Sequence, residues 1–288
     1  MAVKSILVHV DEHDGLPSVL ECALLVAKRF GSHIEGLHVR PGLPRMIPGG
    51  AEGALLTTGE IIEDLERRDQ EVSRRARQRF EAFMREHDVQ PGRGLPPSGQ
   101  PSACWAERRA AGDDVLGSLG RVFDLIVVGR PRRGASKPSV AALEAALFES
   151  GRPVLMAPPA APSSGLGESV AIAWNGSTET ARTIALAMPF LVRAKEVLVL
   201  SVEEGMVAGP TAPEVARNLL QHDIAARTKH VRAGGRAVGA VILEECAAAG
   251  ADLLIKGAYT QSRFRQMILG GATSHIIGAA ELPVIIAH

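Results

Sequence analysis

Two glycine segments near the carboxyl end of the chain have the residue types of a phosphate-binding turn. Gly257 follows an apolar run, and Gly270-Gly-Ala-Thr273 comes thirteen positions later. A glycine turn after a buried strand, followed by one that opens a helix, presents backbone N–H groups to an anion, and the Thr273 hydroxyl adds a donor. Arg263 and Arg265 lie between the segments and suit charge-assisted contacts. The spacing predicts an anion site, although either glycine segment alone also fits a plain strand exit or helix start.

A second group of polar residues follows an earlier apolar run, at Trp174, Asn175 and Ser177. A short polar side chain at the end of a strand can hydrogen-bond a base or a ribose and also start the next helix. Asn-Gly-Ser is equally an ordinary strand-to-helix turn with a serine cap. Both interpretations remain open from the residues alone.

The elements that must position these residues occur twice. Ser5–Asp11 matches Ser169–Asn175, Asp124–Gly129 matches Asp252–Gly257, and Pro153–Ala157 matches Pro283–Ala287. Three matches in the same order indicate duplication of a whole fold. Between the first two landmarks the front copy is 36 residues longer, and the excess falls between Pro41 and Gly112.

The alternation of apolar runs with helical patterns predicts an α/β fold: two tandem, doubly wound, five-stranded parallel-sheet units. Residues 158–167 are rich in Pro, Ser and Gly, so we place the units at 1–158 and 168–288. In a doubly wound sheet, ligands bind beyond the carboxyl ends of the strands. The strands are expected near 5–10, 33–39, 102–106, 124–128 and 153–157 in the front unit, and near 169–174, 196–202, 226–231, 252–256 and 283–287 in the rear unit.

One long charged helix is expected over 59–87. Its apolar residues recur at spacings that suit a single buried face. These residues are Ile61, Ile62, Leu65, Val72, Ala76, Phe80 and Phe83.

Composition narrows the function. The chain has 32 basic and 32 acidic residues, so no overall field attracts nucleic acid or an acidic membrane. The three cysteines are widely spaced, which fits a reducing compartment. The first apolar run is too short for a signal peptide, and no stretch approaches the ~20 apolar residues that span a bilayer. We expect a cytoplasmic protein with no membrane or nucleic-acid partner.

With these motifs and its duplication, the chain resembles a tandem universal stress protein, two units of that family fused in one polypeptide. Nucleotide-binding members carry Gly-x2-Gly-x9-Gly and then Ser or Thr after the fourth strand, and an Asp after the first. Gly257 and Gly270 match the outer glycines, and Thr273 falls where the family has a phosphate-contacting hydroxyl. Thr260, Gly271 and Asn175 depart from the pattern. Asn175 would alter the hydrogen bonding to a base or ribose, Thr260 would narrow the phosphate channel, and Gly271 removes a hydroxyl but keeps the N–H.

The resemblance implies a rear pocket for an adenine nucleotide, with ATP favoured and Mg²⁺ the only metal expected with it. Val202, at the end of the second rear strand, matches a position that packs against the adenine. The predicted contacts are Ala173, Trp174, Asn175, Ser177, Val202, Gly257, Tyr259, Thr260, Arg263, Gly270, Gly271, Ala272 and Thr273.

The front unit lacks most of this pattern. Asp11 occupies the family's Asp position and Gly129 ends the fourth strand, but 141–143 is Ala-Ala-Leu where the glycine turn should lie. We predict no triphosphate binding there and keep Asp11, Gly129 and Arg130 as candidate contacts. A further set at this edge has residue types that ligate zinc, but its spacing matches no established metal pattern, so no metal site is predicted. The set is His9, Asp11, His13, His38 and Cys104.

The leading hypothesis is thus a stress-response protein whose rear unit binds an adenine nucleotide. The alternatives are a scaffold or small-ligand binder with a retired ATP site, and a weak ATPase. No paired carboxylate and nucleophile assigns a reaction, so we expect no dedicated enzymatic activity. Because the family pairs through its last strands, 153–157 and 283–287 are expected to pack together with pseudo-two-fold symmetry inside one chain, and a homodimer of whole chains remains open.

Overall fold

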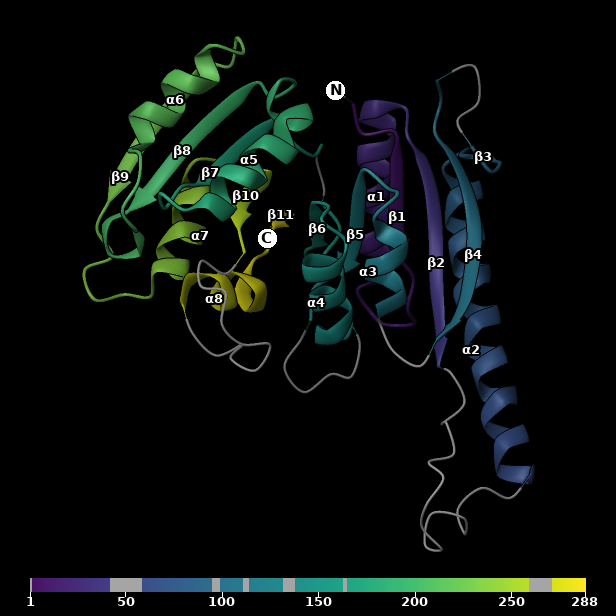
Figure 1. Cartoon of the computed structure of the whole chain (residues 1–288). Coiled ribbons are helices and arrows are strands. Elements are labelled where there is room, and N and C mark those ends of the chain that lie inside the picture. The colour runs from purple at the N-terminus through teal and green to yellow at the C-terminus, as the bar shows by residue number, and fades with distance from the viewer. Residues whose placement is uncertain are drawn as a thin grey trace, which may run out of the picture.

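The computed structural model describes residues 2–41, 59–94, 99–110, 114–131, 138–162, 165–258 and 271–288. Its strands form one sheet of eleven, in the order β3-β4-β2-β1-β5-β6-β11-β10-β7-β8-β9 (Figure 1). Every neighbouring pair is parallel except β6 with β11. The predicted α/β fold of two doubly wound parallel units is confirmed.

The front half supplies the first six strands. Its strand order β4-β2-β1-β5-β6 is the doubly wound order, with the short β3 added at the outer edge. The elements are β1 (Ser5–His9), α1 (Leu16–Phe30), β2 (His33–Pro41), α2 (Gly59–Glu86), β3 (Gln90–Pro91), β4 (Ser102–Ala110), α3 (Asp114–Gly120), β5 (Leu125–Gly129), α4 (Val140–Glu149) and β6 (Val154–Ala157).

The rear half repeats this order as β9-β8-β7-β10-β11. All five predicted strands of each copy occur, within a few residues of their expected bounds. The rear elements are β7 (Ser169–Ala173), α5 (Thr178–Leu191), β8 (Glu196–Val202), η2 (Glu203–Gly205), α6 (Ala212–Leu220), β9 (Ala226–Val231), α7 (Val238–Ala248), β10 (Leu253–Gly257), α8 (Gly271–Ala279) and β11 (Val284–Ala287).

An aspartate before the fourth strand of each half has the same structural role. The Asp124 carboxylate accepts hydrogen bonds from the backbone N–H groups of Lys4 and Ser5 at 2.8 and 3.0 Å. The Asp252 carboxylate accepts from Glu168 and Ser169 at 2.9 and 3.2 Å. In each half the carboxylate satisfies N–H groups at the start of the first strand, which fixes that strand beside the fourth.

The two halves meet at the seam, which we define as the antiparallel pairing of β6 with β11. Val284 pairs with Met156, Ile285 with Leu155, and Ile286 with Val154. Since each step forward on one strand is a step back on the other, the seam has the symmetry of a two-fold axis. The predicted packing through the last strands is confirmed.

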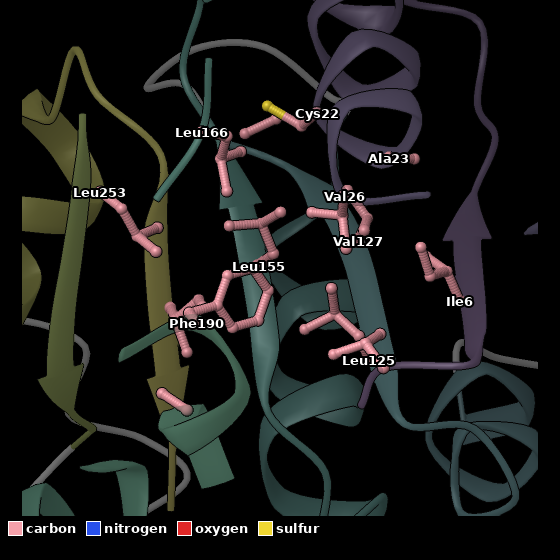
Figure 2. Packing of buried hydrophobic residues seen from close by; sticks show 14 of the residues in the cluster. Ile6, Cys22, Ala23, Val26, Leu125, Val127, Leu155, Leu166, Phe190 and Leu253 are labelled. Carbon is pink, nitrogen blue, oxygen red and sulfur yellow. The ribbon is translucent and has the colours of Figure 1, made fainter. Parts of the chain in front are cut away.

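Side chains on both faces of the sheet continue across the seam. On one face, Leu155 lies between Phe190 and the front-half residues Val127 and Leu125 (Figure 2). Phe30, which ends α1, packs edge-to-face on Phe190 near the end of α5, with ring centroids 5.0 Å apart. Two apolar clusters, one on each face of the sheet, both include residues of the two halves, so each continues across the seam.

Arginines extend the symmetry at the edge of the seam. The Arg29 guanidinium donates to the carbonyl oxygen of Arg193 at 2.5 Å, and the Arg193 guanidinium donates to that of Arg29. The Arg193 guanidinium also lies 4.5 Å from the centroid of the Phe30 ring. Such reciprocal contacts are characteristic of an isologous interface, here built within one polypeptide.

Helix α2 accounts for much of the extra length of the front half, with 28 residues against nine in α6. Its carboxyl-terminal part is buried as expected, with Ala76 at 0% and Phe80 at 2% exposure. The prediction that Leu65 is buried is wrong, because that residue is 44% exposed. Figure 1 shows the reason: the first turns of α2 extend past the ends of β2 and β4. The side chains of Ile61 and Ile62 lie outside the described residues.

Candidate functional site

The carboxyl ends of β7 and β10 form the switch point of the rear half, where the predicted ligand contacts converge. After β7, the Asn175 side-chain oxygen accepts hydrogen bonds from Ser177 N at 3.2 Å and from Thr180 Oγ1 at 2.7 Å. The Ser177 hydroxyl oxygen accepts from Thr180 N at 3.2 Å and caps α5. The capped turn is therefore present. Within the described residues nothing accepts from the Asn175 amide nitrogen, which leaves that donor for a ligand.

The Trp174 side chain is used for packing. Its ring is 5% exposed within the core, and its Nε1–H donates to the carbonyl oxygen of Pro210 at 2.8 Å. The Asn175 carbonyl oxygen accepts from Val207 N at 2.8 Å. These bonds hold segment 207–210 against the turn after β7. Because the Trp174 side chain is used in this way, the predicted ligand contact of Trp174 can involve only its backbone.

Gly257, the last residue of β10, lies against the first turn of α5. A Cβ atom at this position would be 2.4 Å from Thr180 N and 2.7 Å from the carbonyl carbon of Glu179. Glycine is therefore required at this position by the close approach of two backbones. This explanation is independent of any ligand. The contact of Gly257 with Thr180, whose hydroxyl donates to the Asn175 side chain, also holds the end of β10 beside Asn175.

We expect Gly257→Ala to lower the free energy of unfolding by about 2–3 kcal/mol, because a methyl group cannot fit against backbone atoms of α5. Urea denaturation measures the effect. Gly278→Ala is the matched control, since a Cβ there meets nothing within 4 Å and the residue lies in α8. This control should be neutral or stabilising by up to about 1 kcal/mol. Equal effects of the two substitutions would contradict the packing explanation.

Lys256, which is not among the residues predicted from the sequence, has an unusual environment at this edge. It is only 8% exposed, and its ammonium group donates to the Thr273 hydroxyl at 2.7 Å and to the Gly257 carbonyl oxygen at 3.0 Å. Burial lowers its pKa from 10.5 to about 8. No carboxylate forms an ion pair with it in the described part of the chain, and the sequence 259–270 contains no Asp or Glu. Among the described residues, the buried cation beside Thr273 thus has no anionic partner.

Helix α8 begins at this point. Its first residue, Gly271, has φ of 88°, a conformation that glycine adopts without strain. Thr273 is 8% exposed, and Ala272 packs on α7, where a Cβ on Gly239 would lie 2.7 Å from the Ala272 carbonyl oxygen. The first N–H groups of a helix have no partner within it and carry partial positive charge. The start of α8, the Thr273 hydroxyl and the Lys256 ammonium therefore combine into a place suited to an anion.

The remaining predicted contacts divide into two groups. Ala173 and Val202 end β7 and β8, are each 4% exposed, and belong to the same apolar cluster as Ala258 and Ala233. Four predicted residues lie outside the described part of the chain, so their roles stay predictions. They are Tyr259, Thr260, Arg263 and Gly270.

The corresponding edge of the front half is arranged differently. Asp11 is 5% exposed, and its carboxylate oxygens lie 3.7 Å from His9 Nε2 and 3.7 Å from His38 Nδ1. Beside Gly129, the position of a Cβ is 2.5 Å from Pro138 Cγ and 3.0 Å from His13 Cε1, so these two side chains fill the space. The start of α4 is also capped, because Ser139 Oγ accepts from Ala142 N at 2.9 Å. The absence of triphosphate binding in the front half stays a prediction.

Arg130, a candidate anion contact, crosses to the rear half. Its Nη1 donates to the carbonyl oxygens of Gly278 at 2.9 Å and Ala280 at 3.1 Å, at the carboxyl end of α8. A cation is favourable there because the last carbonyls of a helix carry partial negative charge. The front half therefore braces the helix whose amino end belongs to the rear site.

Comparison with known proteins agrees with this architecture. The family model described as the Universal stress protein family matches residues 170–288, and no match was found among curated protein sequences. A solved universal stress protein from Archaeoglobus fulgidus DSM 4304 is similar in structure with a TM-score of 0.68 and 18% identity, covering 99% of this chain and 96% of that one. A structure from Pseudomonas aeruginosa UCBPP-PA14 has a TM-score of 0.54 and 16% identity, with 99% and 93% covered.

At these identities the solved structures establish the fold alone, and they do so over nearly the whole chain. The described part of the chain contains no helix long and apolar enough to cross a membrane. The universal stress protein family model thus matches the rear half, residues 170–288, and the shared fold extends over nearly the whole chain.

Proposed function

We propose that this chain is a stress-response protein whose rear half binds an adenine nucleotide, with ATP favoured and its phosphates placed against the start of α8. The observation that carries the proposal is the Lys256 ammonium, buried beneath the Thr273 hydroxyl with no carboxylate partner in the described residues. Burying an unpaired ammonium is unfavourable, and a phosphate offers the missing negative charge. Thr273 is the residue that the family resemblance assigns to the phosphate.

The Asn175 amide supports the nucleotide over a simple anion. Its oxygen accepts hydrogen bonds within the turn, and its nitrogen is a donor of the kind that ring nitrogens or hydroxyl oxygens of a nucleoside accept from. Asp at this position would offer acceptors only, so the substitution changes the hydrogen-bond pattern and keeps polar recognition. In this proposal the front half binds no triphosphate and braces α8 through Arg130.

Thermal unfolding of the full chain with ATP, ADP, AMP and inorganic tripolyphosphate, with and without Mg²⁺, tests the proposal. A ligand that binds only the native state adds about 2.7 kcal/mol at 100 times its Kd, so a saturable rise in Tm is expected with ATP. Tripolyphosphate should give a smaller rise because it lacks the base and ribose. No rise with any nucleotide at millimolar concentration would sink the proposal, and equal rises with ATP and tripolyphosphate would remove its adenine part.

Two variants locate the ligand. Thr273→Val keeps the shape of the side chain and removes the hydroxyl, so the ATP-dependent rise in Tm should shrink. Ser139→Ala removes the cap of α4 in the front half and should leave the ATP-dependent rise unchanged, although it lowers the starting Tm. The reverse result would place the ligand in the front half.

A further inference from the structure

Three potential metal ligands meet on neighbouring strands of the front half, away from the rear site. His33 and Glu35 lie two residues apart at the start of β2, so their side chains share one face of the sheet. Cys104 on β4 pairs with Glu35, and Ser102 pairs with His33. The Cys104 sulfur is 3.4 Å from His33 Nε2 and 3.9 Å from Glu35 Oε2, and one ligand atom from each residue lies within 4.8 Å of the others.

A chain of hydrogen bonds orients the His33 ring. The Ser102 hydroxyl donates its one hydrogen to the Gly94 carbonyl oxygen at 2.7 Å, so toward His33 Nδ1, 2.8 Å away, it acts as acceptor. Nδ1 therefore carries the ring proton, and Nε2 directs its lone pair toward Cys104. Metal-binding histidines usually have such a partner on their other nitrogen.

We propose that His33 Nε2, Cys104 Sγ and the Glu35 carboxylate bind a zinc ion. On a tetrahedral zinc ion with ordinary bond lengths, S, N and O ligand atoms lie about 3.4–3.6 Å apart. The two separations from the Cys104 sulfur, 3.4 and 3.9 Å, need shifts of only a few tenths of an ångström, and the His33 and Glu35 ligand atoms lie within 4.8 Å of each other. Among the described residues the cluster offers three ligands, which leaves the fourth position of the ion for water or a small ligand.

Charge in the cluster favours a cation over a reactive thiol. Burial and the neighbouring Glu35 carboxylate raise the pKa of Cys104 to about 11, with Arg93 acting in the opposite direction. A nucleophilic cysteine requires a lowered pKa, so a Cys-His catalytic pair does not fit. Burial lowers the pKa of His33, against the raising effect of the Glu35 carboxylate. A divalent ion would replace the thiol proton. Its positive charge would also offset the repulsion between the Cys104 thiolate and the Glu35 carboxylate.

This cluster differs from the set of potential ligands that the sequence places at the carboxyl edge, for which no metal site is predicted. Cys104 was grouped with His9, Asp11, His13 and His38 at the carboxyl edge, but its partners are at the other end of β2. The register explains this, since Cys104 pairs with Glu35 and not with His38, which pairs with Glu107.

The experiment is metal binding by the full chain. After saturation with ZnSO₄ and dialysis, elemental analysis should find one zinc per chain in the wild type. Titration with zinc should show an affinity at least tenfold lower for Cys104→Ser and Glu35→Gln. With Co²⁺ alone, the wild type should show a thiolate-to-cobalt charge-transfer band that Cys104→Ser lacks. Ser102→Ala removes only the partner of His33 and should weaken zinc binding about 10–100-fold.

Controls separate this site from surface binding and from misfolding. His87→Gln removes a histidine that is not one of the three proposed ligands and lies partly buried beside Glu21, so it should leave zinc content and the cobalt band unchanged. Circular dichroism confirms that each variant folds, and Glu35→Gln provides a second probe if Cys104→Ser does not. Zinc content that is equal in all variants, or a wild type that retains Cu²⁺ or Ni²⁺ but no zinc, would overturn the proposal.

Discussion

Lys256→Met should make the protein more stable at pH 7 and at the same time abolish its stabilisation by ATP. Methionine has a similar length and no charge, so the desolvation cost of the buried ammonium disappears. The lowering of the Lys256 pKa from 10.5 to about 8 corresponds to a cost of roughly 3 kcal/mol at about 1.4 kcal/mol per unit. Loss of the hydrogen bond to Thr273 offsets part of it, so we expect a net gain of about 1–3 kcal/mol in the free energy of unfolding.

The pH dependence of this gain identifies its cause. Below the folded pKa of about 8, Lys256 is charged in both states and the full cost applies. Between pH 8 and 10.5 the unfolded chain binds more protons than the folded one, so the stability of the wild type rises relative to Lys256→Met. Above 10.5 the lysine is neutral in both states and the advantage of the variant vanishes. Urea denaturation of the wild type and of Lys256→Met at pH 7, 9 and 10.5 measures this change in the difference between their free energies of unfolding.

Lys195→Met is the matched control. The Lys195 side chain is 73% exposed and pairs with Glu168 at the surface, so its replacement should change stability by less than about 1 kcal/mol. A Lys256→Met variant that is less stable than the wild type at pH 7, or whose advantage persists at pH 10.5, would contradict the account. A substitution that raises stability and removes ligand binding is expected where a residue that binds the ligand, here Lys256, is itself unfavourable for folding.

The sequence predicts the strands well because burial imposes a strong pattern on them. Each fourth strand is an apolar run that begins after Asp124 or Asp252 and ends at a glycine, and these features mark both the duplication and the edge where ligands bind. The pairing of the last strands also follows from their apolar character and from the symmetry of two like units. The outer part of α2 was predicted less well, because periodicity shows which residues share a face and not whether another element covers it.

The candidate sites depend on contacts between distant residues, which no local pattern shows. Lys256 and Thr273 meet because α8 starts beside the end of β10, and the one available signal was a lysine inside the run Leu-Leu-Ile-Lys-Gly257. The contact of Arg130 with the end of α8 exists because the seam places the two halves side by side. The cluster of His33, Glu35 and Cys104 depends on the register of β2 with β4, and the alternating pattern of a strand does not reveal the register of its neighbour.

Cysteines at Met156 and Val284 should form a disulfide across the seam and stabilise the chain strongly. These residues pair directly in the antiparallel register, where Cα atoms are about 4.5–5.5 Å apart, within the range for a disulfide. The bond would close a loop of about 130 residues, for which the chain-entropy model gives roughly 4–5 kcal/mol. Comparing the oxidised and reduced forms of the same Met156→Cys/Val284→Cys variant cancels the cost of the two substitutions.

The control tests the register as well as the contact. In Met156→Cys/Ile286→Cys the two positions are offset by two residues, and Cα atoms about 7–8 Å apart are too distant to bridge. Both pairs are made in a Cys104→Ser background, because Cys104 is the cysteine that is not fully buried. Mass spectrometry should show an intramolecular disulfide in the first pair alone, accompanied by a rise in Tm that reductant reverses. Bridging in the offset pair, or only between separate chains, would mean that β6 and β11 do not pair as Val284 with Met156 inside one polypeptide.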